Sequence, residues 1–364
     1  MKYALVNPNW TFTSSIYFGC REPHLPLEFG YSQALLEKAG HTVLLIDAQL
    51  EGLEDEAVRI RVKAFAPDFL VITTAPSYLF WRCAPPELRV PAQLSKVLRP
   101  HADKLVIVGP HGSTTPVTTL KKLRADAVIA GECEEVLPLL ASSWGNTPHV
   151  LYAGQTMARV QPRASDMKAL PPLEWPQWML AAHKHHHHRF DGKFEGPGAE
   201  MEASRGCPYH CTFCAKDNFR GSCRRRVLPT ILTEMDDLIR KGVGYVYFID
   251  EIFLPWKELL EAVAERDVKF GMQTRIDLWS KEMLDLLGQA GCVSIEAGVE
   301  SISEAGRMEL QKQCRLSAAE LAERLVYAKQ RIPFVQANLI AMEKDPPDEV
   351  ESFRQELLQN GGLG

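Results

Sequence analysis

The chain has 364 residues, of which 46% are apolar and 24% charged, and this is enough material for two domains with separate cores. Its formal net charge of −5 gives no electrostatic case for nucleic-acid binding, and no apolar run approaches the length that crosses a bilayer. Because the first residues carry no apolar signal segment, we expect a cytoplasmic protein.

Residues 1–145 show the alternation of strands and helices that is typical of a doubly wound parallel sheet. The apolar runs of strand length are Tyr3–Val6, Thr42–Ile46, Phe69–Ile72, Lys104–Val108 and Asp126–Ala130. Helical periodicity lies between them, for example over Tyr31–Ala39, where Gly40 ends the pattern. We therefore predict an α/β, Rossmann-like first domain over residues 1–145.

Small and polar residues gather where these strands end, which is where such sheets bind ligands. They are Asn7, Asp47, Thr73, Thr74, Gly109, Pro110, His111, Gly131 and Glu132. Glycine and proline also end strands without any ligand, so most of these positions have a purely structural alternative. Their recurrence after each predicted strand favours a binding site at this edge.

Residues 146–198 have weak periodicity and many prolines, and we interpret them as a linker. The segment contains a histidine-rich run, His183–His188. Neighbouring imidazoles can bind transition metals, but a solvated loop or a substrate-facing lid explains the run at least as well. We assign no metal to it.

From residue 199 to residue 364 the alternation of strands and helices resumes, and its order predicts parallel strands around a partial barrel. The expected strands are Ala199–Ser204, Val243–Ile249, Val268–Gln273, Cys292–Ala297 and Phe334–Ile340. The expected helices are Pro229–Lys241, Pro255–Glu265, Ser280–Ala290, Ser317–Gln330 and Pro347–Gln359.

Charged residues follow the strands of this second region, at the ends where barrels place their chemistry. They are Asp250, Glu251, Arg275, Asp277, Glu296 and Glu300, and Ser301 follows the last of them. A charge facing a barrel mouth is costly unless a ligand or partner compensates it. The structural alternative is a salt bridge inside the barrel, such as Arg275 with Glu251 or Glu300.

Three cysteines, Cys207, Cys211 and Cys214, lie on one loop after the first of these strands. Three thiolates can hold an iron–sulfur cluster through three of its four irons and leave the fourth iron open, as in an enzyme. A structural zinc site would usually need a second cysteine pair, although His210 could complete a set. Disulfides fit poorly, because the other cysteines are scattered and we expect a reducing compartment.

The spacing Cys-x3-Cys-x2-Cys, with Phe213 before the last cysteine, resembles the signature of the radical S-adenosylmethionine (SAM) enzymes. The resemblance implies that the three cysteines ligate a 4Fe–4S cluster whose open iron binds SAM, and that SAM is cleaved to a 5′-deoxyadenosyl radical. The other cofactor-binding residues that it implies are Phe213, Asp250, Glu251, Arg275, Glu300 and Ser301. Because radical SAM cores resemble six-stranded partial barrels, we expect a partial (β/α)6 barrel over residues 199–364 that apparently lacks its last strand.

The first domain resembles the cobalamin-binding domain of one radical SAM subclass. The segments that carry the resemblance are Asn7-Pro8, His24–Tyr31, Gly109-Pro110-His111 and Gly131–Glu135. In that subclass the glycines let the backbone approach the corrin, so the strand-end residues above become candidate cobalamin contacts. The Asp-x-His-x-x-Gly motif of other cobalamin domains, which supplies a lower axial histidine, is missing from the sequence. Tyr78, Trp81 or Arg82 could block the lower face instead, or these side chains pack between domains.

Together the resemblances imply an enzyme with a 4Fe–4S cluster, SAM and cobalamin, in the first place a methyltransferase that acts on an unactivated carbon of a small molecule. A cyclase or rearrangement enzyme is the alternative within the subclass. A carrier or sensor with a structural cluster is a further alternative, for which Cys223 is the nearest spare thiol. A zinc hydrolase lacks the helical His-x3-His pattern. We expect an electron donor such as flavodoxin or ferredoxin as partner, and no nucleic acid.

Overall fold

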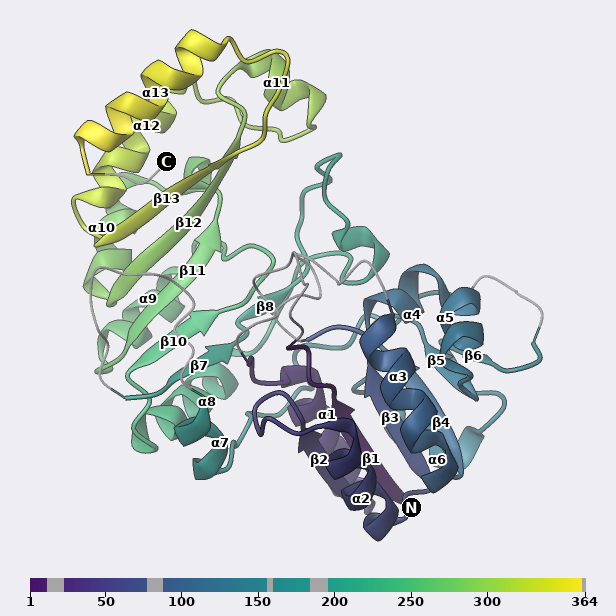
Figure 1. Cartoon of the computed structure of the whole chain (residues 1–364). Coiled ribbons are helices and arrows are strands. Elements are labelled where there is room, and N and C mark those ends of the chain that lie inside the picture. Colours follow the sequence, from purple (N-terminus) through teal and green to yellow (C-terminus); the bar gives the residue numbers. More distant parts are fainter. Residues whose placement is uncertain (12–22, 77–87, 156–159, 184–195, 362–364) are drawn as a thin grey trace. The chain divides into compact units, whose positions relative to one another are not determined.

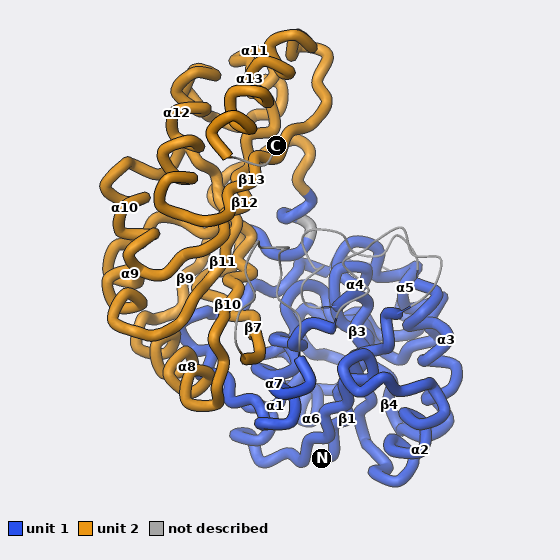
Figure 2. The backbone as a smooth tube through the Cα atoms, turned by 60° about the vertical axis from the view of Figure 1, so that its left-hand side comes forward, with its two compact units in different colours: residues 1–185, 215–221 blue, residues 186–214, 222–364 orange. Residues whose placement is uncertain are grey.

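The structure is a computed structural model that describes residues 1–11, 23–76, 88–155, 160–183 and 196–361 (Figure 1). The chain forms two compact units. One comprises Met1–His185 with Ala215–Gly221, and the other comprises His186–Cys214 with Ser222–Gly364 (Figure 2). The first unit therefore extends past the domain end predicted at residue 145, and it also takes in seven residues that follow the cysteine loop.

The first unit contains a six-stranded sheet in the order β2-β1-β3-β4-β5-β6. Its strands are β1 (Lys2–Asn7), β2 (Thr42–Asp47), β3 (Phe69–Thr73), β4 (Lys104–Val108), β5 (Ala127–Ile129) and β6 (Val150–Tyr152). The first five are parallel, as predicted for a doubly wound sheet, and β6 joins β5 in antiparallel orientation. β6 falls in the predicted linker, because three residues carry too little pattern to indicate a strand.

Helices cover both faces of this sheet, so its strands are apolar almost without interruption. The helices are α1 (Leu27–Lys38), α2 (Asp55–Phe65), α3 (Arg89–Leu98), α4 (Pro110–Thr114), α5 (Pro116–Leu123), α6 (Leu140–Ser143) and α7 (Gln177–Ala182). Tyr3 and Leu5 of β1 pack in one core layer with side chains of α1 and α6. Ala4 and Val6 face the other layer, which is formed with α2, α3 and α5.

The second unit contains a five-stranded sheet in the order β13-β12-β11-β10-β7. Its strands are β7 (Gly198–Met201), β10 (Tyr245–Phe248), β11 (Lys269–Thr274), β12 (Cys292–Glu300) and β13 (Phe334–Leu339). All pair in parallel, which confirms the five strands predicted for a partial barrel. In the part of the chain that the structure describes, β7 and β13 are the edges of this sheet.

The helices of the second unit follow its strands in turn (Figure 1). They are α8 (Leu228–Arg240), α9 (Lys257–Ala264), α10 (Lys281–Gln289), α11 (Glu304–Glu309), α12 (Ala318–Lys329) and α13 (Pro347–Gln359). Five were predicted, and α11 was missed because six residues give little periodicity. Ser317 and Glu320 form a capping box at the start of α12, which satisfies backbone donors of its first turn. No helix among the described residues is long and apolar enough to cross a membrane.

Candidate functional site

The cysteine loop, residues 207–214, lies between two short strands that pair in antiparallel orientation, β8 (Ser204–Arg205) before it and β9 (Arg224–Arg225) after it. Cys207 and Cys211 are partly exposed and Cys214 is exposed, and all three are thiols outside any disulfide bond. Phe213 is 49% exposed. Thiols and a large aromatic ring on the surface of one loop are unusual, so the loop has the accessibility that binding a cofactor requires.

The three cysteines of this loop are the donors that a 4Fe–4S cluster takes, because each thiolate binds a different iron. Among the residues that the structure describes, no three His, Cys, Asp or Glu side chains are grouped so that they could hold one metal ion.

Asp250 and Glu251, which follow β10, hold the segment that leads into the cysteine loop. The buried Asp250 carboxylate accepts hydrogen bonds from the Ala203 N–H (2.9 Å) and the Ser204 hydroxyl (2.5 Å). Burial raises the pKa of Asp250 to about 8. Glu251 accepts a 2.6 Å hydrogen bond from the N–H of Gly206. Both acids were predicted to bind the cofactor, and the structure gives them a further role in positioning the loop.

Two buried ion pairs stiffen the base of the same loop. The Arg205 guanidinium lies 2.8 Å from the Glu202 carboxylate, and Arg226 lies 2.7 Å from Glu234. Arg226 also donates a 3.0 Å hydrogen bond to the Glu202 carbonyl oxygen. Separation of either buried pair would leave an uncompensated charge away from water. The two pairs therefore favour the observed positions of β8 and β9.

Arg275, which follows β11, contacts the cysteine loop through Tyr209. Its guanidinium carbon lies 4.1 Å from the centre of the Tyr209 ring, and its nitrogens donate hydrogen bonds of 3.1 and 2.7 Å to Asp277. The structural alternative of a salt bridge between Arg275 and Glu251 or Glu300 is wrong, because Asp277, two residues ahead, pairs with Arg275 instead. Nη1 of Arg275 is buried and has no hydrogen-bond partner among the described residues, so one donor remains for a ligand.

A buried lysine that the sequence analysis missed lies beside Glu300. The Lys312 ammonium donates to the Glu300 carboxylate and, over 3.0 Å, to the Gly298 carbonyl oxygen. Burial lowers the pKa of Lys312 to about 8. Glu300, Gln311 and Gln313 have φ values of 62°, 52° and 54°, a left-handed conformation that is costly for such residues and collects at functional sites. No sequence signal indicates this lysine, because a lysine in a polar stretch is ordinarily exposed.

Ser301 lies directly after β12 and Glu296 lies on it, and both side chains are buried. The Ser301 hydroxyl donates a 2.7 Å hydrogen bond to Asp345, so it helps to fix the loop that follows the strand. Glu296 is buried and lies in register with Gln273 of β11 and Gln336 of β13. A role in cofactor binding remains a prediction for Ser301.

In the first unit, the predicted strand-end residues lie at the carboxyl edge of the sheet, and several bond to one another. The Asn7 amide donates to Asp47 (3.0 Å), and its oxygen accepts from the Trp10 indole (2.8 Å). Burial raises the pKa of Asp47 to about 6. The Thr73 hydroxyl donates to the Ala75 carbonyl oxygen over 2.9 Å. These contacts explain the side chains without a ligand, so their role in cobalamin binding remains a prediction.

The next strand exit lies between β4 and α4, where Gly109 and Pro110 are buried and His111 is partly exposed. The Thr74 hydroxyl donates to the Val108 carbonyl oxygen (3.2 Å) and accepts from the N–H of His111 (3.3 Å). Gly109 has φ 104° and ψ −174°, and Pro110 starts α4. Only glycine adopts this backbone conformation readily, so the turn requires Gly109 whether or not a ligand approaches it.

The exit of β5 carries Gly131 and Glu132. A Cβ atom on Gly131 would lie 2.2 Å from the Arg163 carbonyl oxygen, and its φ is 82°, so the close approach of Arg163 explains this glycine. The Glu132 carboxylate accepts a 2.8 Å hydrogen bond from the N–H of Ser165 and lies 3.6 Å from Arg220. A small recess with room for about one water molecule opens here. It is lined by Glu28, Gly109, Gly131, Glu132, Cys133, Glu134, Phe219 and Arg220.

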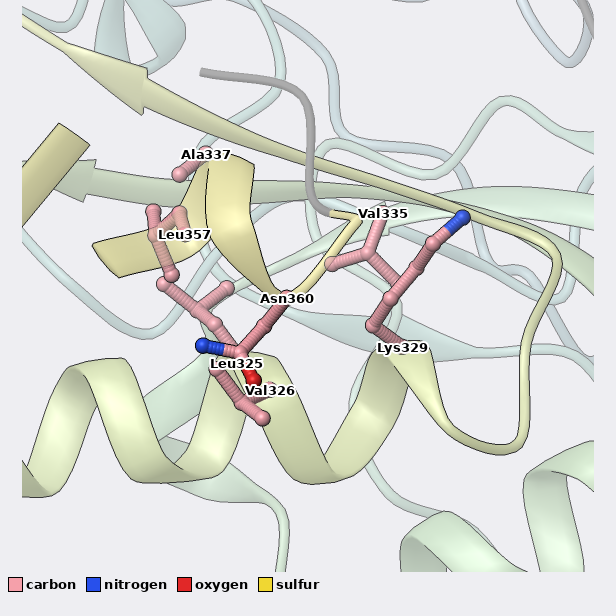
Figure 3. A pocket seen from close by; sticks show the side chains of 7 residues that line it. All are labelled: Leu325, Val326, Lys329, Val335, Ala337, Leu357 and Asn360. Carbon is pink, nitrogen blue, oxygen red and sulfur yellow. The ribbon is translucent and has the colours of Figure 1, made fainter. Parts of the chain in front are cut away.

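Some predicted residues lie outside the described part of the chain. These residues are Tyr78, Trp81, Arg82 and the histidines His185–His188. His183 itself is buried after the end of α7. A second small hollow lies among α12, β13 and α13 (Figure 3). Leu325, Val335 and Leu357 line it and the cysteine loop contributes nothing to it, so we assign it no chemistry.

Comparison with known proteins gives these residues a family context. Residues 201–357 match the model of the radical SAM superfamily. An uncharacterized methyltransferase of Pyrococcus horikoshii is 23% identical over 83% of this chain and 66% of its own length. The anaerobic magnesium-protoporphyrin IX monomethyl ester cyclase of Rubrivivax gelatinosus is 24% identical over 77% of this chain and 52% of its own length. The chain thus spans between half and two thirds of these relatives.

A solved structure shares the fold of nearly the whole chain. The radical SAM methyltransferase TsrM from Kitasatospora setae, with cobalamin and a [4Fe–4S] cluster bound, superposes with a TM-score of 0.74. The alignment covers 99% of this chain and 73% of TsrM at 18% identity. At 18% identity this similarity shows a shared fold, and the shared fold covers both units of the chain.

Proposed function

The chain belongs to the radical SAM superfamily, and on that premise we propose that it is a cobalamin-dependent enzyme that cleaves SAM and methylates an unactivated carbon of a small molecule. The observation that carries the proposal is the cysteine loop. Three reduced and accessible thiols follow the first strand of a parallel sheet, and that strand end is where such folds place their chemistry.

Cys207, Cys211 and Cys214 would hold the cluster, which when bound supplies the electron that cleaves SAM. The protein's contribution is to fix the loop before the cofactor arrives. Glu251 holds the N–H of Gly206, and Tyr209 packs against Arg275. Because a preorganised site needs little rearrangement, these contacts favour binding at the loop.

Arg275 and Lys312 are the cations that we propose for the carboxylate of SAM. Both are buried near the loop, and the charges of Arg275, Asp277 and Cys211 are close enough to Lys312 to affect its pKa. The donor Nη1 of Arg275 is available, and Lys312 can divide its three protons between Glu300 and a ligand. Asp277 and Glu300, which pair with these two cations, then balance the positive charge on this side of the sheet.

We propose the first unit as the cobalamin-binding part, with Thr73, Thr74, Gly109, Pro110, His111, Gly131 and Glu132 as candidate contacts. The support is the fold shared with a cobalamin-containing structure and the glycine-dependent turn that Gly109 makes at the strand exit. Since Asn7 and Asp47 bond to each other, they would shape this edge instead of contacting the ligand through free side chains. Bound cobalamin would supply the methyl carrier. We also propose a flavodoxin- or ferredoxin-type electron donor.

Cyclisation without methyl transfer is a second candidate, which the similarity to the Rubrivivax cyclase favours. The test is anaerobic reconstitution with iron, sulfide and hydroxocobalamin, followed by reduction and addition of methyl-labelled SAM. Methyl transfer predicts that the label moves from SAM to the corrinoid and that S-adenosylhomocysteine forms. Cyclase chemistry predicts 5′-deoxyadenosine with the label retained in methionine. No corrinoid bound at full cluster content would contradict the cobalamin assignment.

A further inference from the structure

The segment that directly follows the cysteine loop folds with the first unit. Ala215–Gly221 belongs to that unit, whereas Cys214 before it and Ser222 after it belong to the second (Figure 2). The segment forms a tight turn, in which the Lys216 carbonyl oxygen accepts hydrogen bonds from the N–H groups of Phe219 (3.0 Å), Arg220 (2.7 Å) and Gly221 (3.2 Å). We call residues 215–221 the strap.

One buried ion pair ties the strap to the sheet of the first unit. The Arg220 side chain is 2% exposed and its Nη1 lies 3.6 Å from the carboxylate of the fully buried Glu132. The second oxygen of Glu132 accepts a 2.8 Å hydrogen bond from the N–H of Ser165, so this carboxylate is held on both sides. Glu132 follows β5 and lines the recess described above together with Glu28 and Glu134.

The charges around the recess explain why Arg220 matters. Glu28, Glu132 and Glu134 are each no more than 3% exposed, and buried carboxylates repel one another unless a cation lies among them. Arg220 is the cation among the residues that line the recess. Loss of the Arg220 charge would therefore leave these carboxylates without this cation, and the strap would be held less firmly against the sheet of the first unit.

We propose that Arg220 is a positioning residue that fastens the strap and thereby restrains the carboxyl-terminal side of the cysteine loop through the chain itself. The amino-terminal side of the loop is held separately by Asp250 and Glu251. The consequence for the cluster rests on the proposed function. The restraint of the loop does not, and it can be measured in protein without cofactors.

The test is hydrogen exchange, followed by mass spectrometry, on reduced, cofactor-free full-length protein. For Arg220→Gln we expect exchange of the amides of residues 212–221 to rise about tenfold, while residues 203–206 keep wild-type rates. Arg220→Lys should stay close to wild type, because it keeps the charge beside Glu132. Asp250→Asn should show the reverse pattern, with faster exchange at residues 203–206 only. Arg163→Gln is the matched control, since its 2.7 Å pair with Glu135 lies in the same unit and does not involve the strap.

A second measurement addresses the cluster. After reconstitution, we expect the Arg220→Gln variant to show a changed or broadened electron paramagnetic resonance spectrum of the reduced cluster, and Arg220→Lys to restore the wild-type spectrum. Unchanged exchange at residues 212–221 in Arg220→Gln would overturn the proposal, as would an equal effect of Arg163→Gln. Faster exchange with an unchanged cluster spectrum would overturn the positioning role. If wild-type protein fails to cleave SAM while the exchange pattern appears, only the proposed function fails.

Discussion

The strand ends of the two sheets use their polar side chains in different ways. In the first unit, Asn7 and Asp47 bond to each other, and the hydroxyl of Thr74 bonds to the backbone of the neighbouring strand. In the second unit, the carboxylates of Asp250 and Glu251 accept hydrogen bonds from the segment before the cysteine loop. The first edge is stabilised internally, whereas the second prepares a loop for a ligand.

The difference predicts which substitutions affect stability and which affect cofactor binding. Apart from Glu132, which pairs with Arg220 of the strap, changes at the strand ends of the first unit should lower its stability and leave the cysteine loop intact. Changes in the second unit should alter SAM or cluster binding as well as stability.

The largest expected loss of stability comes from Gly131→Ala. The added Cβ would overlap the Arg163 backbone, so we expect the first unit to lose about 3 kcal/mol or more of unfolding free energy. Gly154→Ala is the matched control, because Gly154 has a similar φ of 84° with nothing within 4 Å and should lose only about 1 kcal/mol. Urea unfolding of both variants measures the difference, and equal losses would show that overlap with Arg163 is not what requires glycine.

Lys312→Met tests the second unit at its buried cation. It leaves the Glu300 carboxylate without its partner, so we expect the KM for SAM to rise about tenfold or more and the stability to fall by about 3 kcal/mol. Lys344→Met is the control, because Lys344 is exposed and pairs with Glu309 only over 3.9 Å. A normal KM for SAM in Lys312→Met protein that retains its cluster would exclude a SAM contact for this lysine.

Asp250 should give the second unit a pH-dependent stability. Burial raises the folded-state pKa from 3.8 to about 8, so within this window the folded protein holds a proton that the unfolded chain has lost. The contribution of this group to the unfolding free energy therefore falls as pH rises, by at most about 1.4 kcal/mol per pH unit. Relative to Asp250→Asn, the wild type should lose stability between pH 5 and pH 7.5, measured by denaturant unfolding. If the unfolding free energies of the two proteins change with pH in parallel, the raised pKa of Asp250 is contradicted.

The smallest effect is expected from relieving backbone strain beside Lys312. Gln313 has a φ of 54°, and Gln313→Gly should raise the unfolding free energy by about 0.5 kcal/mol, because glycine adopts this conformation without a steric cost. Thermal unfolding with the midpoint compared between variants checks this. A clear loss of stability would show that the Gln313 side chain makes a contact that outweighs the strain.

Much of the fold could be predicted because hydrophobic periodicity is a local property. The apolar run Tyr3–Val6 is a strand in the structure, and so is Phe334–Ile340 except at its last residue. β6 and α11 escaped prediction because three or six residues carry almost no periodic pattern. The membership of Ala215–Gly221 in the first unit depends on contacts between distant parts of the chain, which periodicity does not report.

The candidate site was predicted in its residue types and less well in its contacts. Cys207, Cys211 and Cys214 are marked by spacing alone, and spacing is visible in the sequence. The pairing of Arg275 with Asp277 and of Lys312 with Glu300 depends on how loops turn after their strands. Such turns include non-glycine residues with positive φ, which no residue preference indicates.

The central claim is that the cysteine loop holds a cluster that cleaves SAM, and a pair of cysteine substitutions tests it most directly. Cys211 belongs to the motif, while Cys223 is a partly buried free thiol outside it. After anaerobic reconstitution and reduction, wild type and Cys223→Ala should contain equal iron and form 5′-deoxyadenosine from SAM, and Cys211→Ala should do neither. A fully loaded wild-type protein that forms no 5′-deoxyadenosine, or a Cys211→Ala variant that matches wild type, would contradict the account.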